Sequence, residues 1–236
     1  MRFTRFTATL LAALGLAAMP AAHAAGGSGS DRPHPDWTTT VTAGEDGSHV
    51  LGNPAANVKL TEFVSYTCPH CAHFHKESDA ALKLGYVLPG KVSLEIRHIV
   101  RDPVDLAAAL LTNCGDPRNF FRNHNLFLQT QDRWIAPLAN ATEGQKQRWT
   151  TGALPVRMKA IANDFGFFAM MAQRGYQRAA LDRCLSDEAM ARRLIAQTQN
   201  GGKAGVEGTP SFMLDGTLLT GTHDWQSLDS QLRARF

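Results

Sequence analysis

The chain has 236 residues, of which 24 are Lys or Arg, 21 are Asp or Glu and four are Cys. This near-balance of positive and negative charge gives no electrostatic reason to expect a nucleic-acid partner. A chain of this length can bury a full core without cross-links, so we expect the cysteines to have specific tasks.

The first 24 residues have the pattern of a signal peptide. Arg2 and Arg5 precede the apolar run LLAALGLAAM, and Ala22-His23-Ala24 matches a small-residue cleavage site. The apolar run is shorter than the roughly 20 residues that a membrane span needs. We therefore expect cleavage near Ala24 and a soluble, exported protein. Loss of Arg2 and Arg5 would leave 22 basic residues (24 minus 2) against 21 acidic ones.

Strands are predicted to follow a flexible lead-in. Residues 25–36 are small, polar and punctuated by proline, which is typical of a linker. Residues 37–43 predict a strand that ends at the turn GEDG. Residues 57–66 predict a stronger strand, in which the period of two places Glu62 on the apolar face.

A helix is predicted next, from Pro69 to about Leu84, because a proline is tolerated at the first helical position. Residues 91–100 predict another strand. From Asp102 the spacing of apolar residues becomes helical and continues to about Gln199. Within this block, Asp102-Pro103 and Asp116-Pro117 each combine an N-cap with a first-turn proline.

After residue 200 the strand pattern returns. Asp215-Gly216 predicts the two-residue turn of a hairpin, and an amphipathic helix follows. We therefore predict an α/β domain made of residues 37–101 and 201–236, with a helical domain of residues 102–200 inserted into it.

The motif Cys68-Pro69-His70-Cys71 stands where the strand ends and the helix begins. Free N–H groups and the positive end of the helix dipole favour an anion at that place. The Cys68 thiolate would be stabilised there and would attack near neutral pH. Cys71 lies one turn inside the helix and suits a resolving thiol.

Two other interpretations of this cysteine pair remain open: a structural disulfide and a metal site. Cys68, Cys71, His73 and His75 could supply four zinc or copper ligands within eight residues. However, residues two apart point to different faces of a helix, and the sequence has no second ligand pair with zinc-finger spacing.

Thr209-Pro210 lies directly before the predicted strand at 211–214. A proline is tolerated at the first position of a strand, and a cis bond there would leave a backbone edge free for an extended peptide. The alternative is an ordinary trans turn. The strand–CxxC–helix unit upstream favours the cis form.

Together these residues resemble the DsbA-like branch of the thioredoxin superfamily. The resemblance rests on Glu62-Phe63, on TCPHC at 67–71 and on GTPSF at 208–212, and it covers roughly residues 50–236. It implies a thioredoxin fold with an inserted helical domain and a periplasmic thiol–disulfide oxidoreductase that needs no cofactor and no metal. Cys68 would be its nucleophile, Cys71 its resolving thiol and Thr209-Pro210 its substrate-binding loop.

The resemblance also implies partners. Reduced or unfolded exported proteins would be the substrates, and a DsbB-type, quinone-linked membrane oxidase would reoxidise the dithiol. Thr209 departs from the valine of the best-known oxidases and occurs in isomerase-type relatives, so a reductase or isomerase is the alternative. Residues 25–50 are too few for a separate dimerisation domain, which favours the oxidase.

Three further residues are candidates near the dithiol. His70 can donate a hydrogen bond or a positive charge to the Cys68 thiolate. Glu62 should be partly buried with its charged form disfavoured, and the resemblance gives it a role in proton movement at Cys71. A solvated edge residue is the alternative for Glu62. His98 also lies on an apolar face, where a core histidine is favoured over a proton shuttle.

Cys114 and Cys184 lie in the helical block, and neither has an activating motif beside it. In an oxidising compartment two remaining cysteines usually pair, so we expect a structural disulfide. Two separate buried thiols and a second redox site are the alternatives.

Overall fold

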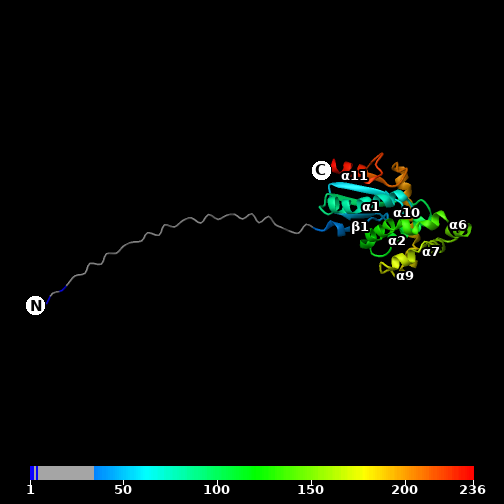
Figure 1. The fold of residues 1–236 in the computed structure, drawn as a ribbon, viewed down its shortest axis with the longest axis horizontal. Helices are drawn as coiled ribbons and strands as arrows, with labels where there is room; N and C mark the ends of the chain where they lie inside the picture. Colours follow the sequence, from blue (N-terminus) through cyan, green and yellow to red (C-terminus); the bar gives the residue numbers. More distant parts are fainter. Residues whose placement is uncertain (3, 5–34) are drawn as a thin grey trace. The chain divides into compact units, whose positions relative to one another are not determined.

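The computed structural model describes residues 35–236, together with residues 1, 2 and 4 (Figure 1). Apart from those three positions, the predicted signal peptide at 1–24 lies outside the described residues, as does the predicted lead-in up to residue 34. Among the residues that the structure describes, none of the helices combines the length and apolar character that a membrane crossing requires.

A six-stranded mixed sheet forms the centre of the part from residue 35 onward, in the order β1-β2-β4-β3-β5-β6. Only β3 and β4 run parallel, and the other neighbours are antiparallel. The strands are β1 Val41–Ala43, β2 His49–Gly52, β3 Val58–Val64, β4 Val92–His98, β5 Ser211–Leu214 and β6 Thr217–Leu218. The parallel pair β3 and β4 is joined through helix α1 (Pro69–Leu82), as a parallel crossover requires.

The start of this sheet differs from the sequence prediction. The strand predicted over residues 37–43 is split, because the Asp36 carboxylate accepts a hydrogen bond from the Thr38 N–H and caps a 3-10 turn at Trp37–Thr39, η1. Strand β2, which follows the predicted turn, was not predicted at all. Its four residues are too few to show an alternating pattern, and pairing with β4 supplies their hydrogen bonds.

The helix after the CxxC motif is confirmed. Helix α1 begins at Pro69 and ends at Leu82, two residues before the predicted end, and continues as one π-helical turn at Lys83–Val87, η2. The predicted hairpin is also confirmed: Asp215 and Gly216 both have positive φ, as a type I′ turn requires. Helix α11 (Trp225–Arg233) then closes the chain against α1.

The two faces of the sheet are covered by different helices. Phe74 of α1 packs on Phe212 of β5, with ring centroids 4.7 Å apart, on the face that carries Glu62. On the other face, Gly201 of α10 lies so close to Phe63 and Ile99 that a Cβ at this position would come within 2.7 Å of Ile99. The glycine therefore allows α10 to approach the sheet.

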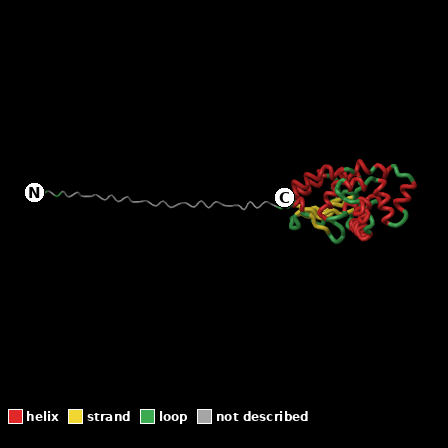
Figure 2. Tube along the Cα trace, turned by 90° about the horizontal axis from the view of Figure 1, so that it is seen from below, coloured by secondary structure: helices red, strands yellow, loops and turns green. Residues whose placement is uncertain are grey.

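Between β4 and β5 the chain forms the predicted block of helices, which extends beyond the strands in Figures 1 and 2. Its members are α2 Pro103–Thr112, η3 Pro117–Asn119, α3 Phe120–Gln129, α4 Gln131–Trp134, α5 Ala136–Ala139, α6 Glu143–Thr150, α7 Leu154–Asp164, α8 Phe167–Ala172, α9 Arg178–Cys184 and α10 Glu188–Lys203. Helix α2 is the core of this block, because nine of its ten residues are buried and it contacts α3, α6, α7, α9 and α10.

Candidate active site

Cys68 stands at the junction between β3 and α1. It is the N-cap of α1, with extended backbone dihedrals, and Pro69 occupies the first helical position. Its thiol donates a hydrogen bond to the Thr209 carbonyl at 3.2 Å, and the Thr209–Pro210 peptide bond is cis. The structure therefore brings the two sequence motifs together across 141 residues of chain.

The two thiols of the motif have opposite acidities. Hydrogen bonding with the Cys71 thiol is the main cause that lowers the pKa of Cys68 to about 4, and the Thr209 side chain and the N–H groups of Cys71 and His70 assist it. Burial opposes this shift. Cys71 is fully buried, and burial raises its pKa well above the ordinary value. At neutral pH the thiolate is therefore on Cys68, and Cys71 holds its proton.

The loop that leads to Cys68 is tied to the start of helix α2. Asp105 accepts hydrogen bonds from the Ser65 hydroxyl at 2.6 Å and from the Tyr66 N–H at 2.8 Å. Asp102 accepts from the Thr67 hydroxyl at 2.7 Å while it caps α2. Burial raises the pKa of Asp105 to about 7. Both carboxylates therefore hold the loop, although the sequence predicted only the capping role of Asp102.

A second tie comes from helix α4. The buried Gln131 side chain donates one hydrogen bond to the Tyr66 carbonyl at 2.6 Å and a second to the Cys68 carbonyl at 2.9 Å. Both hydrogens of the Gln131 amide group thus bind backbone carbonyls at or near the nucleophile. Gln131 could not be predicted as a site residue, because a glutamine in a short helix carries no local signal of a partner 63 residues away.

Glu62 lies beneath the motif, within the core. It is 2% exposed and pairs with Ile96 of β4 and Phe212 of β5 in the sheet register. Its Oε1 atom has no hydrogen-bond partner among the described residues. Burial, assisted by the negative charge of Asp79, raises the pKa of Glu62 to about 8. The carboxyl is therefore protonated at neutral pH and could exchange a proton.

His70 lies at the surface of the motif, where its side chain is exposed. Its backbone N–H contributes to the lowered pKa of Cys68. Its ring makes no hydrogen bond to either sulfur in the structure described from residue 35 onward. A contribution of the ring would therefore have to act through its charge alone.

His98 is a buried histidine within a polar cluster. Its Nε2 atom lies 3.4 Å from the Tyr66 hydroxyl, and the same hydroxyl lies 3.0 Å from Nδ1 of His124. The Gln197 Oε1 atom accepts from the His98 N–H at 2.6 Å. Burial lowers the pKa of His98 to about 4, which keeps the ring neutral at pH 7. The structure therefore supports the interpretation of His98 as a core histidine whose polar atoms have hydrogen-bond partners.

An open cavity of about 280 Å³ adjoins Cys68. Its wall is formed by the residues Cys68, His70, Ile99, Arg101, Val206, Glu207, Gly208 and Thr209. The lining is partly apolar and carries one positive and one negative side chain, Arg101 and Glu207. A polypeptide segment of mixed character could lie here beside the nucleophile.

The other two cysteines are joined in the structure. Cys114, just beyond α2, and Cys184, at the end of α9, form a disulfide that spans 70 residues. Cys68 and Cys71 are both free thiols.

The geometry gives the metal-site alternative no support. His73 is exposed and pairs with Glu77, whereas His75 is buried and lies 3.0 Å from the Asn125 amide oxygen. The candidate ligands therefore do not converge. No group of three or more His, Cys, Asp and Glu side chains is placed to hold a metal within the described part of the chain.

Comparisons with known proteins agree with this architecture. A family model described as thioredoxin matches residues 44–234. The crystal structure of a protein-disulfide isomerase from Novosphingobium aromaticivorans is 56% identical, covers 80% of this chain and 97% of its own, and has a TM-score of 0.78. The structure of Wolbachia pipientis alpha-DsbA1 superposes with a TM-score of 0.62 at 19% identity, over 78% of this chain and 88% of its own. The predicted thioredoxin fold with a helical insertion is thereby confirmed.

A curated relative of Rickettsia typhi, named as a candidate protein-disulfide oxidoreductase, is 33% identical over 182 residues. The match covers 76% of this chain and 59% of the relative. A similar relative of Rickettsia prowazekii is 32% identical, over 73% of this chain and 56% of its own length. The chain thus spans less than three fifths of the length of these curated relatives.

Proposed function

The chain belongs to the thioredoxin family, in its DsbA-like form, and from this premise we propose that it is a thiol–disulfide oxidoreductase that introduces disulfide bonds into exported proteins. The observation that carries the proposal is the placement of the two thiols: Cys68 caps helix α1 beside the cis Thr209–Pro210 bond, and Cys71 is buried one turn inside the helix. Cys68 is acidic at the helix N-terminus, Cys71 is buried and protonated, and the Thr209-Pro210 loop faces Cys68.

The proposed reaction moves two electrons from a substrate dithiol to the Cys68–Cys71 disulfide. A substrate thiolate attacks the Cys68 sulfur, a mixed disulfide forms, and Cys71 leaves as a thiolate that takes up a proton. The second substrate thiolate then attacks the substrate sulfur of the mixed disulfide and releases Cys68. The substrate gains a disulfide, and the protein keeps two reduced sulfurs.

Glu62 could assist the step in which Cys71 leaves the disulfide. It is buried on the α1 side of β3, and its carboxyl influences the acidity of Cys71. A protonated carboxyl could supply the proton that Cys71 needs when it leaves the disulfide. Its pKa of about 8 makes this transfer feasible near neutral pH.

The acidity of Cys68 supports the oxidising direction. A stabilised thiolate is a good leaving group and stabilises the reduced protein relative to the disulfide. Each pKa unit corresponds to about 1.4 kcal/mol, or about 30 mV for a two-electron couple. With the pKa of Cys68 at about 4, we expect the disulfide to be strongly oxidising.

A protein-disulfide isomerase is the second candidate, because a 56% identical relative carries that name and because Thr209 precedes the cis-proline. An isomerase must be kept reduced, whereas an oxidase must be reoxidised.

For the oxidase we propose a DsbB-type, quinone-linked membrane partner and reduced exported proteins as substrates. We place the protein in the periplasm on the strength of the signal peptide predicted at residues 1–24.

The redox potential of the Cys68–Cys71 couple tests the proposal. Equilibration with glutathione buffers should give a value well above that of thioredoxin, whose potential is about −270 mV. The oxidised protein should also form disulfides in a reduced, unfolded client. A potential as reducing as that of thioredoxin would contradict the oxidase. Efficient rearrangement of scrambled disulfides by the reduced protein would favour the isomerase instead.

A further inference from the structure

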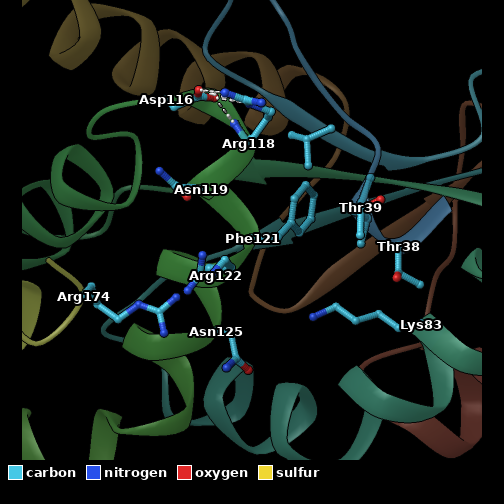
Figure 3. A pocket seen from close by; sticks show the side chains of 12 residues that line it. Thr38, Thr39, Lys83, Asp116, Arg118, Asn119, Phe121, Arg122, Asn125 and Arg174 are labelled. Atoms are coloured by element: carbon cyan, nitrogen blue, oxygen red, sulfur yellow. Dashed lines mark hydrogen bonds and ion pairs between the residues drawn. The ribbon is translucent and has the colours of Figure 1, made fainter. Parts of the chain in front are cut away.

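A second cavity lies away from the dithiol. It has a volume of about 650 Å³ and is open to solvent. Among its lining residues are Thr39, Lys83, Arg118, Arg122, Asn125 and Arg174, which Figure 3 labels. We call this cavity the basic pocket, because four of its lining residues are cationic and only Asp116 is anionic.

The basic pocket is remote from Cys68. Lys83 directly follows the C-terminal end of α1, whereas Cys68 caps the N-terminal end. Fifteen residues of helix correspond to about 22 Å. A ligand in this pocket would therefore not compete with a substrate at the dithiol.

Two of the four cations are already neutralised. Arg118 makes a two-pronged ion pair with Asp116, drawn as dashed lines in Figure 3. Lys83 lies 2.6 Å from the Asp79 carboxylate, which belongs to α1. Their charges are largely balanced before any ligand arrives.

Arg122 and Arg174 differ from these two cations. Neither makes an ion pair or a side-chain hydrogen bond within the described residues, although both line the same cavity. Figure 3 shows their side chains extending into the same region between α3 and the turn after α8. Two guanidinium groups that face one space without a counter-charge repel each other, and an anion between them would remove that repulsion.

The turn that carries Arg174 is anchored by a neighbouring side chain. Arg174 lies in the turn between α8 and α9, two residues before Tyr176. The Tyr176 hydroxyl donates to the Cys114 carbonyl at 2.9 Å and accepts from the Asn123 amide at 2.8 Å. The turn is thus anchored both to α3 and to the residue that forms the disulfide. The backbone that carries Arg174 is therefore anchored, while the Arg174 side chain itself is exposed and has no hydrogen-bond partner among the described residues.

Asn125 adds a neutral donor to the pocket. Its Oδ1 atom lies 3.0 Å from Nε2 of the buried His75, so the imidazole orients the amide. The Nδ2 group is left without a partner among the described residues and can donate to a ligand. A pair of guanidinium forks with an oriented amide is a donor set suited to phosphate or carboxylate oxygens.

We propose that the basic pocket binds a small multivalent anion, a molecule that carries two or more phosphate or carboxylate groups. Arg122 and Arg174 hold it through charge-assisted hydrogen bonds, and Asn125 orients it. The volume of the pocket is within the range of small-molecule sites, which is about 300–1,000 Å³. Because the pocket is lined by both β1 and α3, the ligand connects the edge of the sheet to the helical insertion.

Isothermal titration calorimetry of the purified protein tests this inference with two probes, tripolyphosphate and citrate, at constant ionic strength. We expect one site per chain for at least one probe. Binding of tripolyphosphate alone identifies the ligand as a phosphate, and binding of citrate alone identifies it as a carboxylate. Binding of both probes supports a site for multivalent anions of either kind. Arg122→Gln and Arg174→Gln should each weaken binding about tenfold or more. The matched control is Arg192→Gln, an exposed arginine of α10 that does not line the pocket, which should keep the affinity within twofold.

Two results would overturn the proposal. One is the lack of saturable binding of either probe up to millimolar concentration. The other is an equal loss of affinity in Arg192→Gln and in the pocket variants, which would indicate a non-specific response to surface charge. Thermal unfolding of each variant checks that it is folded. Arg122→Lys, which keeps the charge but not the fork, should bind more weakly than wild type and more tightly than Arg122→Gln.

Discussion

The protein contains two cysteine pairs that lie in different surroundings. Cys68 and Cys71 lie three residues apart at a helix N-terminus, with free thiols and an open cavity beside them. Cys114 and Cys184 lie 70 residues apart inside the helical insertion and are joined. Cys114 is 2% exposed, and its own carbonyl accepts a hydrogen bond from the Tyr176 hydroxyl.

Because Cys68 and Cys114 are almost equally buried, at 3% and 2% exposed, the local electrostatics and the position relative to a helix end separate the reactive pair from the structural one. At the first pair, hydrogen bonds to sulfur lower the pKa of Cys68, and burial raises that of Cys71. No helix begins at either member of the second pair, because Cys114 follows α2 and Cys184 ends α9. A helix C-terminus disfavours a thiolate.

Removal of the reactive cysteines one at a time should have the greatest effect on activity. Cys68→Ala and Cys71→Ala should each lower the rate of client oxidation more than 100-fold, because each destroys the disulfide. Only Cys71→Ala should accumulate mixed disulfides with clients, since it keeps the acidic nucleophile. Non-reducing gels measure these adducts. Equal trapping by both variants, or none by Cys71→Ala, would show that the roles of the two thiols are assigned wrongly.

The second pair should contribute to stability and not to turnover. The double variant Cys114→Ala/Cys184→Ala opens a loop that spans 70 residues, for which the chain-entropy model gives a loss of roughly 4 kcal/mol. This corresponds to a fall in melting temperature of about 10 °C for a protein of this size. Calorimetry measures the fall, and client oxidation should stay within twofold of wild type. A large loss of oxidation in a folded double variant would instead indicate a second redox site.

Much of the fold around the reactive pair could be predicted from the sequence, because the signals for it come from residues that are adjacent in the chain. A strand, a CxxC motif and a helix-starting proline follow one another, and Asp215-Gly216 fixes its turn by itself. What could not be predicted depends on contacts between distant residues. Gln131 and Asp105 act on the loop before Cys68 from helices far along the chain, and β2 is defined by its pairing with β4.

The buried histidines around Phe120 should respond to acid. His49 stacks on Phe120 at 3.9 Å, and burial lowers its pKa to about 4, while His98 and His124 are also buried with lowered pKa values. The unfolded state therefore binds more protons than the native state between pH 4 and the ordinary histidine value of about 6.5. The free energy of unfolding that these groups support is present above pH 6.5 and is lost as the pH falls.

His49→Phe isolates one of these contributions. Glu62 and Asp105, whose raised pKa values of about 8 and about 7 act in the opposite direction, are common to both proteins and cancel in the difference. From pH 6.5 to pH 4, wild type should lose about 1.4 kcal/mol per pH unit relative to His49→Phe. Urea unfolding over this range measures the difference. His73→Phe, at an exposed position, controls for loss of a histidine as such, and a pH-independent difference for His49→Phe would contradict the prediction.

The helical insertion contacts the reactive pair through Gln131, and loss of this contact should have a modest effect. Gln131 donates to the Tyr66 and Cys68 carbonyls and so fixes the orientation of Cys68 at the helix N-terminus. Gln131→Met has a similar length and no donors. The loop should loosen, the Cys68 sulfur should lose part of its hydrogen bonding, and the pKa of Cys68 should rise by roughly one unit, or about 1.4 kcal/mol.

Thiolate absorbance as a function of pH measures this shift, and the potential should become less oxidising by about 30 mV. The matched control is Gln173→Met, an exposed glutamine at the end of α8. If Gln131→Met lowers the melting temperature and leaves both the pKa and the potential unchanged, Gln131 only packs the insertion against the sheet. If both shift, the helical insertion sets the reactivity of one cysteine pair while it encloses the other.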